Sequence, residues 1–149
     1  MHELHSQIEI DATPEEVWRV LVDVERYHEW NPFIVDVHGV VQHGARLRMV
    51  MHPPGGRAVT LKPAVTKVQP KQVFEWWGHL VVRGLFDGRH RFELEPTARG
   101  TRVAQTETFT GILVPLLRRS LDTHTAAGFE LMNHALKAQV ERVRATAGA

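Results

Sequence analysis

The chain has 149 residues, of which 43% are hydrophobic and 23% are charged, and its formal net charge is +1. This length suits a single domain, residues 1–149, and is sufficient to bury a substantial core. The near-neutral charge gives no electrostatic reason to expect nucleic acid or an anionic membrane as a partner. Because cysteine is absent, a disulfide framework, a thiol nucleophile and a cysteine-based metal site are excluded.

The N-terminal segment MHELHSQIEI alternates polar and apolar residues, which is typical of a half-buried strand. It lacks the basic region and the apolar run of a signal peptide, and no apolar segment of the chain has the length needed to span a bilayer. We therefore expect a cytoplasmic protein without stable membrane insertion.

Two short helices are expected after the first strand. In the segment ATPEEVWRVLVD, Thr13 is a natural N-cap and Glu16 completes a capping box with it, while a proline suits the first helical position. The sequence also allows a second helical turn over residues 24–30, before an Asn-Pro pair ends any continuous helix.

The region from Phe33 to Thr110 reads as a series of strands separated by turn signals. These signals lie at residues 43–44, 53–56, 69–71, 87–88 and 96–100. Parallel pairs would need long crossover connections, whereas these turns are short, so we expect about six antiparallel strands.

A long helix is expected from Pro115 to Arg144, a segment without an internal proline. Apolar or small residues recur along it every three or four positions and form one continuous stripe. They are Val114, Leu117, Leu121, Thr125, Gly128, Met132, Leu136, Val140 and Val143. A helix on the order of 43 Å long needs a whole sheet to cover its stripe. A strongly curved sheet closes badly around such a helix and leaves a pocket.

Alternation along the strands predicts which side chains face that pocket. The inward set is apolar and includes Met49, Trp76, Phe92 and Phe109, and its polar exceptions are His90, Gln105 and Glu107. Trp77 follows Trp76 directly and so lies on the outer face, where it covers an edge or serves a homodimer contact.

The register of the two strands that carry these polar residues decides how they meet. A four-residue turn at residues 97–100 places His90 opposite Glu107, and a shift by two residues places it beside Gln105 instead. In both cases a histidine and a carboxylate share one wall. Three roles follow: the two groups satisfy each other, they anchor a hydroxyl or carbonyl of a ligand, or they act as acid and base.

The order of several segments resembles the START-like (SRPBCC) superfamily over nearly the whole chain. The segments are TPEEVW, YHEWNPF, FEWWG, LFDGRHRFELEP and GTRVAQTETFTGIL, followed by the long terminal helix. The similarity is closest to the bacterial branch labelled polyketide cyclase/dehydrase or lipid-transport-like. It implies an α+β helix-grip fold, in which a seven-stranded antiparallel sheet wraps around the C-terminal helix and leaves a hydrophobic cavity.

The resemblance also suggests a place for YHEWNPF, because the segment after the first short helix caps one mouth of the cavity in such folds. Trp30 and Phe33 would then be lid or wall residues; alternatively, Trp30 fills the core between helix and sheet. Gly128 lies on the inward stripe, where glycine costs about 1 kcal/mol relative to alanine. Either the helix bends there or another group approaches it closely.

These observations predict a protein that binds a small hydrophobic or aromatic ligand, as a carrier or a sensor. The predicted ligand-binding residues are Trp30, Phe33, Met49, Trp76, His90, Phe92, Gln105, Glu107, Phe109, Leu121, Gly128 and Met132. The first alternative is a cyclase- or dehydratase-type enzyme that acts on a polyketide-like substrate with His90 and Glu107 as acid and base. The second alternative is a protein-interaction module, and the resemblance transfers no catalytic residue that would decide among them.

No metal, cofactor or nucleic-acid partner is expected. The ten histidines lack the HExxH and facial-triad spacings of metal sites. The PPGG segment at residues 53–56 lacks the lysine and the helix start of a phosphate-binding loop, and favours a hairpin turn. The sequence is compatible with a homodimer.

Overall fold

The computed structural model describes residues 1–148, which form two antiparallel sheets and a long C-terminal helical segment. The strands are β1 (His2–Ile10), β2 (Ile34–His38), β3 (Arg48–Met51), β4 (Val59–Leu61), β5 (Ala64–Gln69), β6 (Val73–His79), β7 (Asp87–Thr97) and β8 (Gly100–Thr110). The helices are α1 (Pro14–Val22), the 3-10 helix η1 (Val24–Glu29), α2 (Val114–Ser120), the π-helical turn η2 (Leu121–Thr125) and α3 (Ala126–Ala147).

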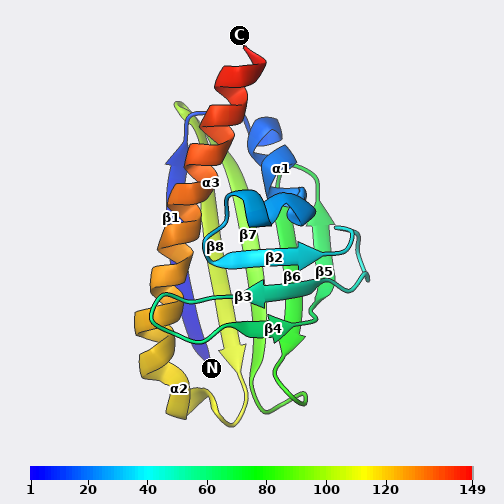
Figure 1. Ribbon diagram of the computed structural model, residues 1–149, viewed down its shortest axis with the longest axis vertical. Helices are drawn as coiled ribbons and strands as arrows, with labels where there is room; N and C mark the ends of the chain where they lie inside the picture. The colour runs from blue at the N-terminus through cyan, green and yellow to red at the C-terminus, as the bar shows by residue number, and fades with distance from the viewer. Residues whose placement is uncertain (149) are drawn as a thin grey trace.

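The larger sheet has the strand order β1-β8-β7-β6-β5, and the smaller sheet has the order β2-β3-β4. Figure 1 shows the smaller sheet crossing in front of the larger one, and α3 lying along β1. The hydrophobic core occupies the space that the two sheets and the helix enclose. The expected α+β class, the antiparallel sheet and the long C-terminal helix are therefore confirmed.

The expected single sheet of seven strands is wrong, because the chain forms a five-stranded and a three-stranded sheet. The two are joined where Arg46 pairs with Ala64 through an isolated bridge. Beside it, the Leu47 N–H donates to the Pro63 carbonyl over 2.9 Å. Proline has no N–H to return to the neighbouring strand, so the ladder cannot continue through this position.

The expected pair of short helices is also corrected: α1 is an α-helix, but the element after it is the 3-10 helix η1. The capping box is present, with the Thr13 N–H donating to the Glu16 carboxylate at 3.0 Å and the Glu16 N–H donating to the Thr13 hydroxyl at 3.2 Å. After η1, the Asn31 side chain accepts hydrogen bonds from the N–H groups of Phe33 and Ile34. These bonds fix the turn into β2.

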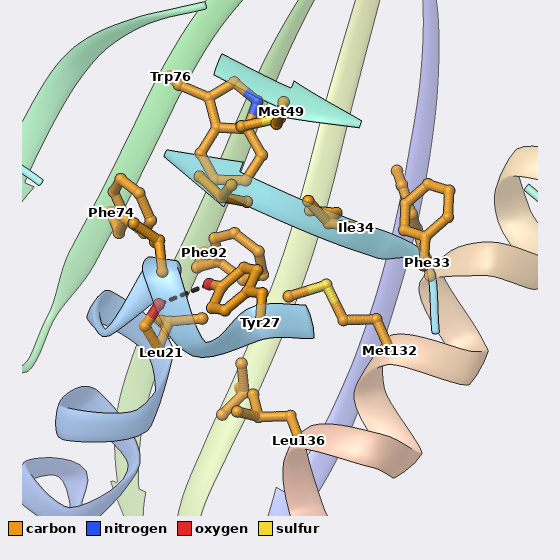
Figure 2. Packing of buried hydrophobic residues seen from close by; sticks show 14 of the residues in the cluster. Leu21, Tyr27, Phe33, Ile34, Met49, Phe74, Trp76, Phe92, Met132 and Leu136 are labelled. Atoms are coloured by element: carbon orange, nitrogen blue, oxygen red, sulfur yellow. Dashed lines mark hydrogen bonds between the residues drawn. The ribbon is translucent and has the colours of Figure 1, made fainter. Parts of the chain in front are cut away.

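The aromatic residues of YHEWNPF mostly fill the core. Tyr27 and Phe33 are fully buried, whereas Trp30 is only half-buried and packs edge-on against Tyr27, with ring centroids 5.0 Å apart. Figure 2 shows the Tyr27 hydroxyl donating to the Leu21 carbonyl near the end of α1, over 2.5 Å. Burial raises the pKa of Tyr27 above its ordinary value of 10.0.

The C-terminal helical segment is continuous from Val114 to Ala147, and its predicted stripe largely faces the core. The buried members are Val114, Leu121, Gly128, Met132, Leu136 and Val140. Val143 departs from the prediction because it is 46% exposed. Within residues 1–148, no helix combines the length and the apolar character that crossing a membrane requires.

Candidate ligand-binding site

The inward face of β6 and β7 changes from crowded to empty along its length. The successive cross-strand pairs are Phe74–Phe92, Trp76–His90 and Gly78–Gly88. In the first two pairs the rings stack, with centroids 5.9 Å and 4.7 Å apart. Glycine has no side chain, so no ring covers the sheet at the third pair: Pro63 lies above Gly78, Oε1 of Glu107 lies above Gly88, and a cavity opens beside them. The sequences FEWWG and DGRHRF thus place an unfilled volume at one end of the core.

A cavity of about 110 Å³ lies at this glycine pair. Its walls come from both sheets, from the loop between β6 and β7 and from η2. Apolar side chains that line it include Phe33, Met51, Leu61, Trp76, Phe109 and Leu121. The polar residues of the lining are Glu107, Thr125 and His79, of which Glu107 contributes a carboxyl group and Thr125 a hydroxyl. The cavity is therefore an apolar chamber with few polar groups.

The predicted site residues divide into those that line this cavity and those that do not. Phe33, Trp76, Glu107, Phe109 and Leu121 line it. Met49, His90, Phe92, Gln105, Gly128 and Met132 are buried in the adjoining core and are not part of the lining. Trp30 lies elsewhere, in a surface groove between α1 and α3. Trp30 is not among the residues that line the cavity; its ring is partly buried against the core, edge-on to Tyr27.

Several lining residues were not predicted from the sequence. They include Met51, Val59, Leu61, Pro63, Leu80 and Phe86. Met51 has the same parity as Met49 along β3, so the alternation of side chains along that strand also turns it inward. The others lie on the short strand β4, on the connection after it and on the β6–β7 loop, where no alternation long enough to assign a face exists.

A line of hydrogen bonds leads from the cavity wall to β1. Glu107 Oε2 is hydrogen-bonded to Nδ1 of His90, and His90 Nε2 lies 2.9 Å from Oε1 of Gln105. The Gln105 amide donates to Asn133 Oδ1 over 2.6 Å, and the Asn133 amide donates to the Ser6 hydroxyl over 3.0 Å. All five residues are buried. Each is thereby paired with another, as burial demands.

The predicted register is confirmed, because His90 pairs with Glu107 and Phe92 pairs with Gln105. Asn133 was missed, although it lies four residues after Phe129 and so on the same face of α3. A polar residue on an apolar stripe was the available signal.

His90 and Glu107 differ in their access to the cavity. The His90 side chain is 0% exposed, since its ring stacks on Trp76 and meets Phe129 edge-on at 5.1 Å between centroids. The Glu107 side chain is 10% exposed and belongs to the cavity wall. A bound molecule can therefore touch the carboxyl group, while the imidazole acts only through it.

Gly128 allows a close approach between α3 and the segment before β2. A Cβ atom at this position would lie 2.4 Å from the ring of Phe33. Phe33 also meets Phe129 edge-on, with centroids 5.5 Å apart. The close-approach interpretation of this glycine is therefore confirmed, and the approaching group is the ring that forms part of the cavity wall.

Comparisons with known proteins agree with this architecture. The sequence model of the family described as "Polyketide cyclase / dehydrase and lipid transport" matches residues 1–148. A search of curated proteins found no match. A solved structure of a Mesorhizobium loti protein is 21% identical, with a TM-score of 0.75 over 95% of this chain and 98% of that one. A Thermus thermophilus protein is also 21% identical, with a TM-score of 0.77 over 95% and 99% of the two chains.

A third similar structure is the di-domain ARO/CYC StfQ from the steffimycin biosynthetic pathway. It is 14% identical, with a TM-score of 0.67, and the match covers 93% of this chain and 51% of that protein. At these identities the three structures show a shared fold.

Proposed function

This chain belongs to the polyketide cyclase / dehydrase and lipid transport family, and we propose that it binds a small hydrophobic or aromatic molecule as a carrier or a sensor. The observation that carries the proposal is the apolar cavity at the Gly78–Gly88 pair. Transfer of apolar surface out of water contributes about 25 cal/mol per Å². A ligand that fills the cavity gains several kcal/mol on that scale, before the costs of association.

The size of the cavity limits the buried part of the ligand. Its volume is about 110 Å³, and an engineered apolar cavity of about 150 Å³ is known to hold benzene. We therefore propose that one aromatic ring, or an aliphatic group of similar size, occupies it. The wall residues Trp76 and Phe109 would contact the ring directly. Met49, Phe92, Gly128 and Met132 would support those walls from the core.

Two experiments test this proposal. Native mass spectrometry of the protein purified from its own source is expected to show a copurifying small molecule. In addition, toluene is expected to change the tryptophan fluorescence of the protein, because Trp76 lines the cavity. Leu121→Phe fills part of the cavity and should weaken toluene binding at least about tenfold, a loss near 1.4 kcal/mol.

The matched control for this variant is Leu116→Phe, which makes the same change at a side chain that is 79% exposed on α2. It should leave toluene binding unchanged. If the two variants bind toluene equally well, or if the wild-type protein does not bind it, the proposed binding function is wrong.

The hydrogen bond between Glu107 and His90 at the cavity wall favours a second candidate, a cyclase- or dehydratase-type enzyme acting on a polyketide-like substrate. Glu107 would exchange a proton with the substrate, and His90 would hold the carboxyl group in place and share its proton. The likeness to a structure described as an ARO/CYC protein supports this candidate at the level of the fold. Glu107→Gln should then abolish turnover of a polyketide-like substrate while toluene still binds, whereas retained turnover would contradict the enzyme.

A further inference from the structure

We propose that the ligand of this cavity carries a hydrogen-bond donor, such as a phenolic or alcoholic hydroxyl, and that Oε1 of Glu107 accepts its hydrogen bond. Such a ligand is therefore favoured over molecules whose polar end only accepts hydrogen bonds, and over carboxylates above all. This inference rests on the proposed binding function and names the chemical class of its ligand.

The orientation of the Gln105 amide fixes the proton on one side of His90. The Gln105 nitrogen faces two acceptors, the Phe129 carbonyl at 3.4 Å and Asn133 Oδ1 at 2.6 Å. A carbonyl oxygen can only accept, so the nitrogen must be on that side. The Gln105 oxygen then faces His90 Nε2 at 2.9 Å, and this ring nitrogen must carry a hydrogen.

Two proton arrangements remain for the bond between Glu107 and His90. Either His90 is an imidazolium and Glu107 is a carboxylate, or His90 is neutral and Glu107 is protonated on Oε2. A deprotonated Glu107 facing a neutral His90 would set two lone pairs against each other at hydrogen-bond distance. In both permitted arrangements the shared proton lies between Nδ1 and Oε2. Oε1 therefore presents lone pairs alone.

Oε1 lies at the floor of the cavity. A Cβ atom at Gly88 would be 2.7 Å from this oxygen, so the oxygen occupies the place that a side chain at position 88 would take. Within residues 1–148, no group forms a hydrogen bond to Oε1, although its partner oxygen is paired. Part of the Glu107 side chain stays exposed, and the residue lines the cavity. A bound molecule is thus met by an acceptor that has no partner of its own.

The rest of the cavity offers little to an anion. Among the described residues that line it, none is a lysine or an arginine, and the ring of His79, which also belongs to the lining, packs against Trp77 with centroids 5.5 Å apart. A carboxylate ligand would place its charge against Glu107 in an apolar chamber, which is unfavourable without a paired cation. A neutral hydroxyl satisfies Oε1 and leaves its carbon skeleton against Trp76 and Phe109.

The test uses four probes with one ring each: phenol, benzaldehyde, toluene and benzoate. Phenol and benzaldehyde are close in size and in polarity, but only phenol donates a hydrogen bond. Dissociation constants are measured with the wild-type protein by tryptophan fluorescence and by ligand-observed NMR. Phenol should bind at least about tenfold more tightly than benzaldehyde, because the donor pairs with a charged or strongly polarised acceptor. Benzoate should show no binding.

Three variants assign this preference to Glu107. Glu107→Leu removes the acceptor and should bring the ratio of the phenol and benzaldehyde affinities close to one. Glu107→Gln should keep part of the preference, because its amide can donate to Nδ1 of a neutral His90 and leave its oxygen above Gly88. The control is Thr125→Val, which removes the hydroxyl group of the lining without a large change of volume and should leave the ratio unchanged.

The outcomes separate this inference from the binding function itself. If toluene and benzaldehyde bind as tightly as phenol, or if Glu107→Leu keeps the wild-type ratio, the cavity binds ligands but the donor requirement is wrong. Benzoate binding would also overturn it. If no probe binds, the proposed function fails and this inference fails with it. Should Glu107→Leu not fold, as judged by circular dichroism, the order of the four affinities in the wild-type protein decides alone.

Discussion

The two ends of the space between the sheets share strands β6 and β7 but are packed differently. At the end near α1, Tyr27, Phe74, Phe92 and Leu136 fill the space with side chains that are fully buried (Figure 2). At the end near η2, the Gly78–Gly88 pair leaves a cavity. The difference lies in a few inward positions of two strands, which shows that the cavity depends on local residue choice as well as on the fold.

The two ends also differ in how their polar groups are satisfied. At the filled end, the Tyr27 hydroxyl donates to the Leu21 carbonyl, so the buried phenol is paired inside the protein. At the open end, Glu107 pairs one oxygen with His90 and presents the other to the cavity. Spare hydrogen-bonding capacity thus coincides with spare volume, which is the combination that a ligand site requires.

The largest expected effect contrasts one aromatic side chain at each end. Phe92→Ala removes a fully buried ring from the filled end and should lower the free energy of unfolding by about 3–5 kcal/mol. Phe109→Ala should cost less, by about 1 kcal/mol or more, because a ring on a cavity wall already lacks contacts on one side. Urea unfolding of both variants measures the difference. Equal losses would mean that the two ends are packed alike.

The contact between Gly128 and Phe33 should give the next effect. Gly128→Ala would force a methyl group against the Phe33 ring, and we expect a loss of about 1–3 kcal/mol from overpacking, in spite of the better helix propensity of alanine. Ala138→Gly, at an exposed position of α3, is the control and should cost about 1 kcal/mol through propensity alone. A stabilised Gly128→Ala protein, seen in urea unfolding, would contradict the close approach.

Because of the buried phenol at the filled end, the stability of the protein should change with pH in the alkaline range. Because burial raises the pKa of Tyr27 in the folded state above 10.0, the unfolded state ionises first as the pH rises. Stability is therefore complete below pH 10 and falls above it, by up to about 1.4 kcal/mol per pH unit. Tyr27 is the single tyrosine of the chain, so tyrosinate absorbance reports this group alone.

We expect the absorbance change of Tyr27 to coincide with the loss of tertiary structure seen by near-ultraviolet circular dichroism. Tyr27→Phe is the control. It should cost about 0.5–1.5 kcal/mol at neutral pH through the lost hydrogen bond, and its stability should fall less steeply in alkali. Ionisation near pH 10 with the fold intact would show that the phenol is not sealed in the core.

The smallest expected effect lies in the loop between β6 and β7, next to the cavity. Val81 has a positive φ of 65° and its side chain is 85% exposed, a backbone conformation that is costly for a β-branched residue. Val81→Gly should raise the free energy of unfolding by about 0.5 kcal/mol, since relief of strain exceeds the added entropy of the unfolded chain. Val82→Gly, one residue later, should lower it instead. Thermal unfolding measures both changes. If the two substitutions change the free energy of unfolding in the same direction, the backbone at Val81 is not strained.

Features that repeat along a single segment were predictable from the sequence. The stripe of the C-terminal helix, the capping box of α1 and the pairing of His90 with Glu107 follow from periodicity, from local hydrogen bonding and from turn length. The burial of Trp76 followed from alternation along β6 in the same way. In each case the atoms that decide the outcome belong to neighbouring residues or to one hairpin.

Only the tertiary structure decided the features in which segments from distant parts of the chain meet. The sheet divides at Pro63, where the segment before β3 meets the segment before β5. Pro63 accepts a hydrogen bond from the Leu47 N–H but has no N–H to donate in return. His90 is sealed from the cavity while Glu107 is not, because Trp76 and Phe129 close over the imidazole ring. Trp30 stays only partly buried because its ring packs edge-on against Tyr27, which already occupies the core. Alternation assigns a side chain to a face, but the volume left on that face depends on every other side chain that reaches it.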